Sequence, residues 1–336
     1  MLWPITASAQ GFAGLGTDVD GFSSPQRPAE FDFPIDHGPH DDYRIEWWYL
    51  TANLEGLDGT PYGLQWTLFR SALTSDGGKG WSSPQLWMGH AAVTTPDAHF
   101  VTERLARGGI GQAGVQADPF EAWIDDWQLV GPDFATLTMT ASGPDFAYDM
   151  VLNSDGPLVF HGDEGYSLKS AEGQASYYYS QPFYAIEGTL ILPTGTIEVA
   201  GDAWLDREWS SQPLSDNQTG WDWFSLSFED GKLMGFRLRQ TDGSDYTSAT
   251  WIDPDGTTTS YSNSAFEAEP VAISDIGGRD VPTTWNVRLA DRGVDVEVTA
   301  INPQAWMNTS VPYWEGPITV QGSHTGRGYL EMTGYD

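Results

Sequence analysis

Cysteine is absent from the 336 residues of the chain. Its absence excludes disulfides, thiolate metal sites, cysteine nucleophiles and iron–sulfur clusters. Lysine is scarce as well: three lysines and twelve arginines stand against 47 acidic residues, and the formal net charge is −32. Such a charge repels phosphate backbones and anionic membrane surfaces alike. We therefore expect neither nucleic acid nor lipid headgroups as partners.

Long hydrophobic runs are also missing. No stretch approaches about 18 consecutive apolar residues, so we expect no integral membrane segment. The chain has no Gly-x-Ser-x-Gly elbow, no phosphate-binding Gly-x-x-x-x-Gly-Lys-Ser/Thr loop and no His-Glu-x-x-His zinc helix. Residues 109–114 (GIGQAG) match a dinucleotide fingerprint by letter, but the βαβ context is lacking. We expect no organic cofactor.

Two histidines lie in residues 37–40 (HGPH), beside Asp36, Asp41 and Asp42. Imidazole and carboxylate groups in this number could chelate a divalent metal. However, a structural metal site needs about four convergent ligands on rigid elements, and Pro39 indicates a loop. We interpret the segment as a solvated turn and expect no metal.

The N-terminus leaves two interpretations open. Ala7-Ser8-Ala9 before Gln10 has the form of a signal-peptidase site, although the charged region and most of the apolar core are missing upstream. As the remnant of an export signal it predicts a periplasmic or secreted bacterial protein. As an ordinary terminal tail it leaves a cytoplasmic location open.

Alternation with period two is the dominant signal further along the chain. Apolar side chains alternate on both sides of residues 57–60 (LDGT), which predicts a hairpin. The same texture recurs at residues 136–141, 185–192, 224–228, 234–238, 294–298 and 318–320. Proline and glycine interrupt the chain too often for long helices. The sequence predicts an all-β protein, as a barrel or a sandwich, because closure removes exposed strand edges.

A weak internal repeat indicates two related barrels. Trp48-Tyr49 and the turn after it resemble Trp223-Phe224 and the turn that follows, and Trp204-Leu205-Asp206 resembles Tyr329-Leu330-Glu331. Chance similarity between aromatic hairpins is the alternative. A tandem duplication predicts a lead-in at residues 1–30, an N-terminal barrel at 31–212 and a C-terminal barrel at 213–336.

Acidic residues embedded in tryptophan are the most informative chemical feature. In a strand, Glu46 shares a side with Trp48, and Asp206 shares a side with Trp204 and Glu208. A carboxyl group against indole rings loses hydration, so its pKa rises and it becomes a candidate general acid. The alternative is a structural ion pair with a neighbouring arginine, Arg44 or Arg207.

Six runs of residues form an ordered set of motifs: Phe33-Pro34-x-Asp36-His37-Gly38-x-His40-x-x-Tyr43-Arg44-x-Glu46-Trp47-Trp48-Tyr49, Met88-Gly89-His90-Ala91-Ala92, Tyr177-Tyr178-Tyr179-Ser180-Gln181-Pro182, Ala203-Trp204-Leu205-Asp206-Arg207-Glu208-Trp209, Gly220-Trp221-Asp222-Trp223-Phe224 and Pro312-Tyr313-Trp314-Glu315-Gly316. Through these runs the chain resembles a known family, the lipocalin-like AttH and carotenoid 1,2-hydratase (hydroxyneurosporene synthase) family. The resemblance covers about residues 31 to 335. It implies two consecutive lipocalin-like (calycin) antiparallel β-barrels, usually in exported bacterial proteins.

The resemblance also implies a chemistry. Characterised hydratases of the family add water across the terminal double bond of an acyclic carotenoid, using an aspartate two positions after an aromatic residue, with aromatics and a histidine assisting. Asp206 after Trp204 matches that aspartate, whereas the matching stretch Tyr177-Tyr178-Tyr179 contains no histidine. Relatives of the same fold bind lipophilic polyketides and guide pericyclic ring closure, and others are labelled secreted hydrolases.

These observations predict a hydratase-like enzyme that protonates a lipophilic isoprenoid alkene and then adds water. A non-catalytic carrier of an apolar ligand, or a pericyclase or isomerase on a polyketide or terpenoid, remains an alternative. The expected partner is a lipophilic small molecule, and the protein is expected to be a monomer or homodimer. The predicted catalytic residues are Asp206 and Glu46. The predicted substrate-binding residues are Trp48, His90, Tyr177, Tyr179, Trp204, Trp221 and Trp223.

Overall fold

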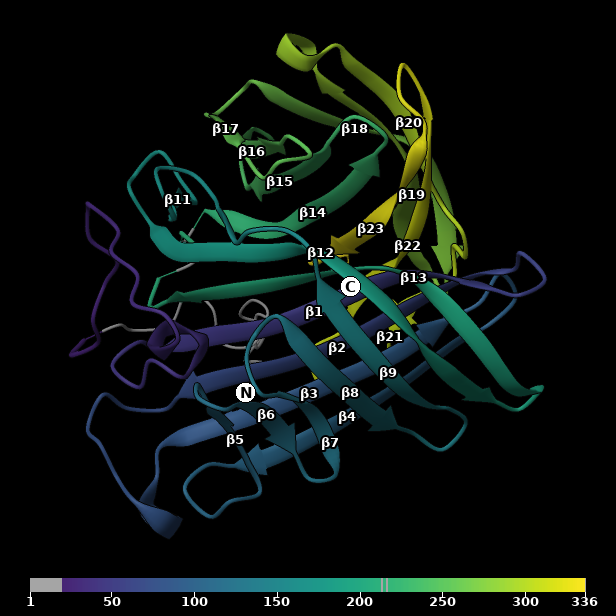
Figure 1. The fold of residues 1–336 in the computed structure, drawn as a ribbon. Coiled ribbons are helices and arrows are strands. Elements are labelled where there is room, and N and C mark those ends of the chain that lie inside the picture. Colours follow the sequence, from purple (N-terminus) through teal and green to yellow (C-terminus); the bar gives the residue numbers. More distant parts are fainter. Residues whose placement is uncertain (1–19, 213, 216, 336) are drawn as a thin grey trace, which may run out of the picture.

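The computed structural model describes residues 20–212, 214–215 and 217–335, and within them it shows an all-β protein built on two antiparallel sheets (Figure 1). The first sheet closes into a nearly complete barrel and the second forms a half-barrel, which confirms the predicted fold class. The first sheet ends at Ser210 and the second begins at Gln218. The export-signal motif at residues 7–9 lies outside the described residues.

The first sheet has 13 strands in the order β4-β3-β2-β1-β13-β12-β9-β8-β7-β6-β5, with β10 and β11 paired to β12. Their bounds are β1 Ile45–Gly56, β2 Pro61–Ala72, β3 Gln85–Thr94, β4 His99–Arg107, β5 Ala113–Gln116, β6 Phe120–Ile124, β7 Trp127–Gly131, β8 Thr136–Ser142, β9 Ala147–Ser154, β10 Val159–Phe160, β11 Tyr166–Leu168, β12 Ala175–Leu192 and β13 Gly195–Ser210.

The second sheet has ten strands in the order β17-β16-β15-β14-β23-β22-β20-β19-β18, with β21 paired to β22. Their bounds are β14 Gln218–Phe228, β15 Lys232–Gln240, β16 Asp245–Ile252, β17 Thr258–Tyr261, β18 Phe266–Ile276, β19 Arg279–Leu289, β20 Val294–Ala300, β21 Trp306–Met307, β22 Tyr313–Gly322 and β23 Gly326–Met332. Three short 3-10 helices complete the described elements: η2 Ile35–His37, η3 Gly80–Ser82 and η4 Ala290–Arg292.

The repeat in the sequence corresponds to a repeat in topology. The first sheet contains the neighbours β2-β1-β13-β12, and the second contains β15-β14-β23-β22 in the same relation. In each sheet the hairpin that opens the unit pairs with the strand that ends it.

Alternation along β1 explains why the two sheets pack against each other. Trp48 and Leu50 point into the core of the first barrel, whereas Tyr49 belongs to a separate apolar cluster that also contains Trp223 and Phe236 of the second sheet. Burial of both faces of a strand is typical of an element in the middle of a molecule. Around β1, the outer face of the first barrel is thereby covered by the second sheet.

His37 and Gly38, in the segment before β1, are buried, which corrects the interpretation of residues 37–40 as a solvated turn. His37 is only 6% exposed, and its ring stacks on Phe134 with centroids 3.9 Å apart. Tyr179 contacts His37 Nδ1 at 2.7 Å. The aromatic residues before β1, Phe31 and Phe33, pack against the core of the barrel, so the segment covers one end of the barrel with its inner side.

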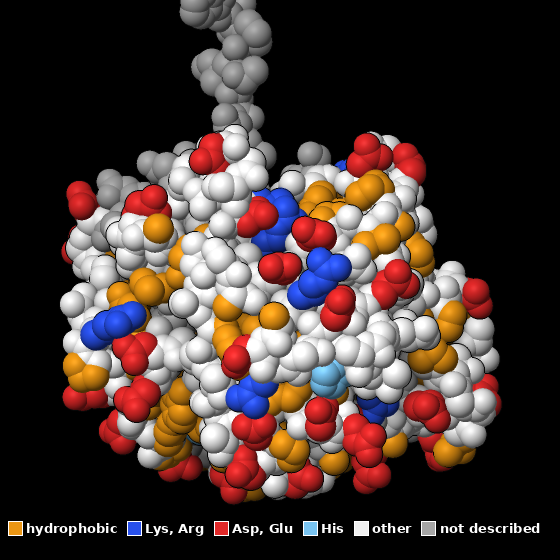
Figure 2. All heavy atoms as spheres, turned by 90° about the horizontal axis from the view of Figure 1, so that it is seen from above, with side chains coloured by type: hydrophobic (Ala, Val, Ile, Leu, Met, Phe, Trp, Pro, Cys, Tyr) orange, Lys and Arg blue, Asp and Glu red, His pale blue; other side chains and the backbone are white. Residues whose placement is uncertain are grey.

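Across the part of the chain that the structure describes, no helix has the length and apolar character needed to cross a bilayer. Acidic side chains are spread over the face seen in Figure 2, and lysine and arginine appear there only in isolated positions. The surplus of acidic over basic side chains on this face agrees with the net charge of −32.

A candidate active site between the two sheets

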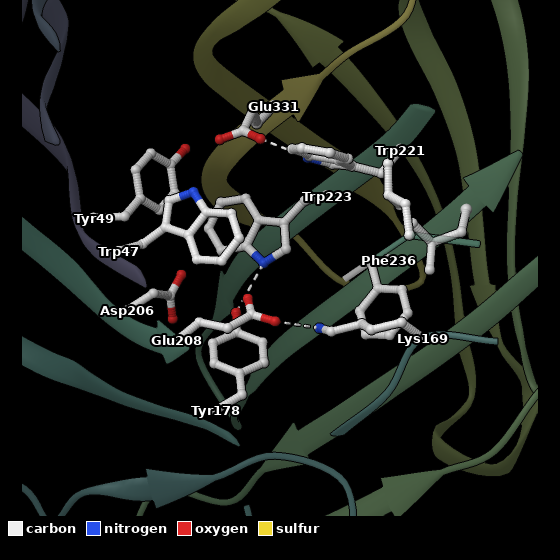
Figure 3. A pocket seen from close by; sticks show the side chains of 12 residues that line it. Trp47, Tyr49, Lys169, Tyr178, Asp206, Glu208, Trp221, Trp223, Phe236 and Glu331 are labelled. Atoms are coloured by element: carbon white, nitrogen blue, oxygen red, sulfur yellow. Dashed lines mark hydrogen bonds and ion pairs between the residues drawn. The ribbon is translucent and has the colours of Figure 1, made fainter. Parts of the chain in front are cut away.

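A pocket of about 90 Å³ lies where the outer face of the first barrel meets the second sheet (Figure 3). Strands β1, β12 and β13 of the first sheet and β14, β15 and β23 of the second contribute to its walls. The lining residues are Trp47, Tyr49, Lys169, Tyr178, Asp206, Glu208, Leu214, Trp221, Trp223, Phe236, Leu238 and Glu331.

Strand alternation on β13 places the acids in this pocket. Asp206 and Glu208 line it, whereas Leu205 and Trp209 between and beside them belong to the core of the first barrel. The site is therefore outside the barrel interior, between the sheets.

Asp206 is the most desolvated acid of the pocket, with 4% of its surface exposed. Its Oδ1 accepts hydrogen bonds from Ser180 Oγ and from Trp204 Nε1, the latter at 2.8 Å. Burial raises the pKa of Asp206 to about 7, against the lowering effect of the hydrogen bonds from Ser180, Trp204 and Tyr178. The carboxyl group consequently keeps its proton close to neutral pH.

A histidine reaches Asp206 through a serine. His161 Nε2 contacts Ser180 Oγ at 2.7 Å, and Ser180 donates to Asp206. Burial lowers the pKa of His161 to about 3, with Lys169 adding to the effect, so the imidazole is neutral. A neutral histidine beside a protonated aspartic acid adds no charge to the apolar wall.

Glu331 places a second unusual carboxyl in the same pocket. Trp221 Nε1 donates to Glu331 Oε1 at 2.5 Å, and burial raises the pKa of Glu331 to about 7. In the repeat noted above, Tyr329-Leu330-Glu331 corresponds to Trp204-Leu205-Asp206. The two sheets thus each contribute one carboxyl group with a raised pKa from equivalent strands, β13 and β23. Asp206 is paired with Tyr49 across the strands, and Glu331 with Trp223.

Aromatic faces and one ion pair form the rest of the wall. Trp223 Nε1 donates to the Tyr178 hydroxyl at 3.1 Å, and the rings of Trp223 and Tyr49 meet edge to face at 5.4 Å. Lys169 Nζ lies 2.8 Å from Glu208 and 4.4 Å from the Phe236 ring centroid. Because Glu208 neutralises Lys169, the pocket presents aromatic surface with little net charge apart from Asp206 and Glu331.

The structure brings some of the predicted site residues together. Asp206, Trp221 and Trp223 line the pocket, and Trp204 holds Asp206 by a hydrogen bond. The remaining predicted substrate-binding residues lie elsewhere: Trp48 and Tyr179 in the core of the first barrel, Tyr177 against Gln26 at its end, and His90 beside Tyr313 and Glu103.

Glu46 is also outside the pocket, and its geometry does not support the predicted catalytic role. Its carboxylate lies 3.0 Å from Arg70 Nε and 2.8 Å from Arg207 Nη2, and its side chain is fully buried. Burial opposes ionisation, but Arg207, His40 and Arg70 together hold the pKa of Glu46 well below its usual range. An acid that stays ionised cannot donate a proton, so Glu46 serves as the centre of a buried ion-pair network.

Sequence reasoning missed Glu331, Tyr178, His161 and Ser180. Glu331 carried a signal, because it stands in the repeat at the position of Asp206. His161 and Ser180 carried no signal in the sequence. Ser180 reaches Asp206 because β12 pairs with β13, and His161 reaches Ser180 because β10, which ends just before it, pairs with β12. Among the described residues, no group of three or more histidine, aspartate or glutamate side chains is arranged to hold a metal ion.

Comparisons with known proteins agree on the fold. A model of the AttH-like family matches residues 24–335. The crystal structure of an AttH-type protein from Nitrosomonas europaea superposes with a TM-score of 0.85 at 32% sequence identity, covering 94% of this chain and 99% of that one. No curated protein matches the chain.

Two more distant structures share the fold. Kievitone hydratase from Nectria haematococca superposes with a TM-score of 0.67 at 13% identity, covering 93% of this chain and 96% of that one. The structure of CghA with Sch210972 gives 0.56 at 12% identity, covering 86% and 88%. At these identities the likeness concerns the fold alone.

Proposed function

The chain belongs to the AttH-like family, and from this premise and the pocket geometry we propose that the protein is a hydratase-like enzyme acting on a lipophilic isoprenoid alkene. Asp206 is the proton donor and the pocket between the sheets is the active site. The observation that carries the proposal is a buried carboxyl group, still protonated near pH 7, set among aromatic rings. A general acid works best when its pKa is close to the operating pH.

Each step of the reaction has a group to perform it. Protonation of the terminal double bond by the Asp206 carboxyl breaks its O–H bond and forms a C–H bond, leaving a tertiary carbocation. The faces of Trp223, Tyr178 and Tyr49 are placed to stabilise that cation, because an aromatic ring is negative on its face. Water then forms the C–O bond, and its proton passes to a pocket carboxylate, which gives a tertiary alcohol.

The size of the pocket fits the reacting end of a long substrate. Sites that enclose a whole drug-sized ligand measure about 300–1,000 Å³, whereas this pocket holds about 90 Å³. A branched terminal isoprenoid unit would enter it, and the remainder of the chain would lie outside. Kievitone hydratase, a hydratase on the same fold, is consistent with this class of reaction.

The test is a product assay on lycopene, an acyclic carotenoid with two such ends, offered in detergent micelles and analysed by mass spectrometry in ¹⁸O-labelled water. We expect labelled alcohol from the wild type, and a loss of about two to four orders of magnitude in turnover for Asp206→Asn, the usual share of general acid catalysis. Asp202→Asn, at an exposed position on the same strand, is the matched control and should keep full turnover.

Ligand binding separates this proposal from its alternatives. Asp206→Asn should bind lycopene as well as the wild type, because the aromatic walls supply the affinity. Binding with no labelled product in the wild type would indicate a carrier. An isomer without ¹⁸O would indicate an isomerase, and equal turnover in Asp206→Asn would contradict the role of Asp206.

A further inference from the structure

A continuous line of hydrogen-bonding side chains leads from the pocket to the protein surface. It starts at Glu331, whose carboxyl interacts with the hydroxyl of Tyr49; Figure 3 shows that hydroxyl directed toward Glu331. Tyr49 in turn donates to Glu315 Oε1 at 2.6 Å. Both links cross between the sheets, since Tyr49 lies on β1 and the two glutamates on β23 and β22.

The line continues on the other side of Glu315. Tyr313, two residues before it on β22, hydrogen-bonds with the Glu315 carboxyl. The Tyr313 hydroxyl lies 3.0 Å from His90 Nδ1, and His90 Nε2 lies 3.1 Å from Glu103 Oε1. Glu103 is the surface end: its side chain is 19% exposed and it accepts a hydrogen bond from Ser310.

We propose that this line, Glu331–Tyr49–Glu315–Tyr313–His90–Glu103, is a proton path that connects the pocket with solvent. Its use in catalysis rests on the proposed function: Glu331 in its ionised form takes the proton that the attacking water releases, and the path carries that proton to solvent while substrate blocks the pocket opening. Asp206 regains its own proton from solvent after the product has left the pocket. The path itself is a property of the folded chain and can be measured without substrate.

The chemistry of the members supports transport. Carboxylic acid, phenol and imidazole groups can each accept a proton on one atom and release one from the same group, so a proton moves along them by successive transfers. A hydrogen-bonded chain in a medium of low dielectric constant also polarises cooperatively. One amide touches the line: Gln65 Nε2 donates to the Tyr313 hydroxyl at 3.4 Å, a longer contact than the 3.0 Å between that hydroxyl and His90 Nδ1, so it lies beside the path and does not replace a member of it.

Burial argues against a purely structural role. Glu315 is 1% exposed, and burial, followed by the nearby Glu331, raises its pKa well above the ordinary value. Tyr329 and Tyr148 also face this carboxyl, and no basic group is among the causes that set its pKa. Apolar residues of similar volume would fill such a position at lower cost in stability. A function that needs a proton-carrying group explains why an acid stands there.

The experiment follows the exchange of the Glu315 carboxyl proton for deuterium. The carboxylic-acid C=O band is recorded by infrared spectroscopy after rapid mixing into D2O, and Glu315→Gln identifies the band by its loss. We expect exchange within the mixing time in the wild type. In the double variant Tyr49→Phe/Tyr313→Phe, which cuts the path on both sides, exchange should slow at least about tenfold, because it then requires local opening of the fold.

Tyr148→Phe is the matched control, because Tyr148 is equally buried in the same region but donates to the Gln65 backbone carbonyl at 3.0 Å. It should exchange as the wild type does. If the double variant melts early, His90→Gln tests the same path from its outer part. Wild-type exchange rates in both path variants, or no Glu315 acid band, would overturn the path.

The outcomes remain separate from those of the proposed function. Loss of turnover in Asp206→Asn together with fast exchange in the path variants would leave the hydratase standing without the path. Slow exchange in the path variants without any hydration product would establish the path in a protein of another activity. If both hold, Tyr313→Phe should lower kcat several-fold while KM is unchanged, whereas Tyr148→Phe changes neither.

Discussion

At the scale of single residues, solvation decides which acid can give a proton. Asp206 and Glu46 are both buried, but two arginines and His40 surround Glu46, whereas only neutral donors touch Asp206. Desolvation raises the pKa of Asp206. At Glu46 the positive charges nearby outweigh desolvation and lower the pKa. The sequence shows both acids beside tryptophan and so could not distinguish them. The arginine partners come from β2 and β13, which only the fold brings to β1.

The raised pKa of Asp206 predicts a dependence of stability on pH. The unfolded chain releases this proton near pH 3.8, the ordinary pKa of an aspartic acid, whereas in the folded chain the pKa is raised to about 7. Between these values the folded state binds more protons, so the free energy of unfolding falls as pH rises and levels off above about 7. At about 1.4 kcal/mol per pKa unit, the total is on the order of 4 kcal/mol.

Asp206→Asn removes this titration. The wild type should therefore lose a few kcal/mol in free energy of unfolding between pH 4 and pH 8 that the variant does not lose, because the neutral amide has no proton to release. Urea unfolding at the two pH values measures the change, and any fixed effect of the amide cancels in the comparison. Asp202→Asn is again the control. A difference between variant and wild type that is the same at both pH values would contradict the assignment of a raised pKa.

At the scale of elements, the hairpins were predictable because their signal is local. The turn at residues 57–60 joins β1 and β2 as predicted; Gly59 has φ of +83°, and Thr60 N donates to Asp58 Oδ1. All six further stretches of alternating residues fall within observed strands. The interpretation of residues 37–40 as a solvated turn was wrong. Their polar residue types suggested exposure to water, but His37 packs with Phe33 at the end of the barrel.

The contact between β2 and β22 depends on a residue without a side chain. A Cβ at Gly63 would lie 2.5 Å from the ring of Pro317, so Gly63→Ala must push the two sheets apart. We expect a loss of about 1–3 kcal/mol in the free energy of unfolding, the usual cost of overpacking. Gly77→Ala is the control, since nothing lies within 4 Å of its Cβ position.

Urea unfolding of the two alanine variants measures the cost. Adding Pro317→Ala to Gly63→Ala should recover part of the loss, because the two side chains would no longer collide. Equal effects at Gly63 and Gly77, or no coupling with Pro317, would show that the sheets do not meet closely at this point.

At the scale of the whole molecule, the pocket exists only because two related sheets face each other. The repeat between residues 204–206 and 329–331 was visible in the sequence, but the sequence gives no measure of how two barrels are oriented. Of the site, Asp206, Trp204, Trp221 and Trp223 could be predicted from the sequence, because Asp206 stands two residues after Trp204 and the other two tryptophans stand two residues apart. Glu331 could have been found from the repeat, where it takes the position of Asp206. Tyr178 and His161 could not, because long-range packing alone places them beside Asp206.

The surplus of acid acts on the molecule as a whole. With 47 acidic and 15 basic residues, the folded protein concentrates repulsion that the expanded chain relieves. Salt screens this repulsion, since the Debye length falls from about 30 Å at 0.01 M to about 3 Å at 1 M. We therefore expect the melting temperature to rise across this range of NaCl.

The same rise should appear in KCl at equal ionic strength, because screening does not depend on the identity of the cation. Sucrose, which carries no charge, controls for general solute effects and should not reproduce the curve. The Glu46 network supplies an internal comparison: its ion pairs are fully buried and little screened, so the destabilisation caused by Glu46→Gln should be nearly the same at low and high salt. A melting temperature that stays flat or falls as NaCl is added would mean that surface repulsion is not what limits the stability of this acidic protein.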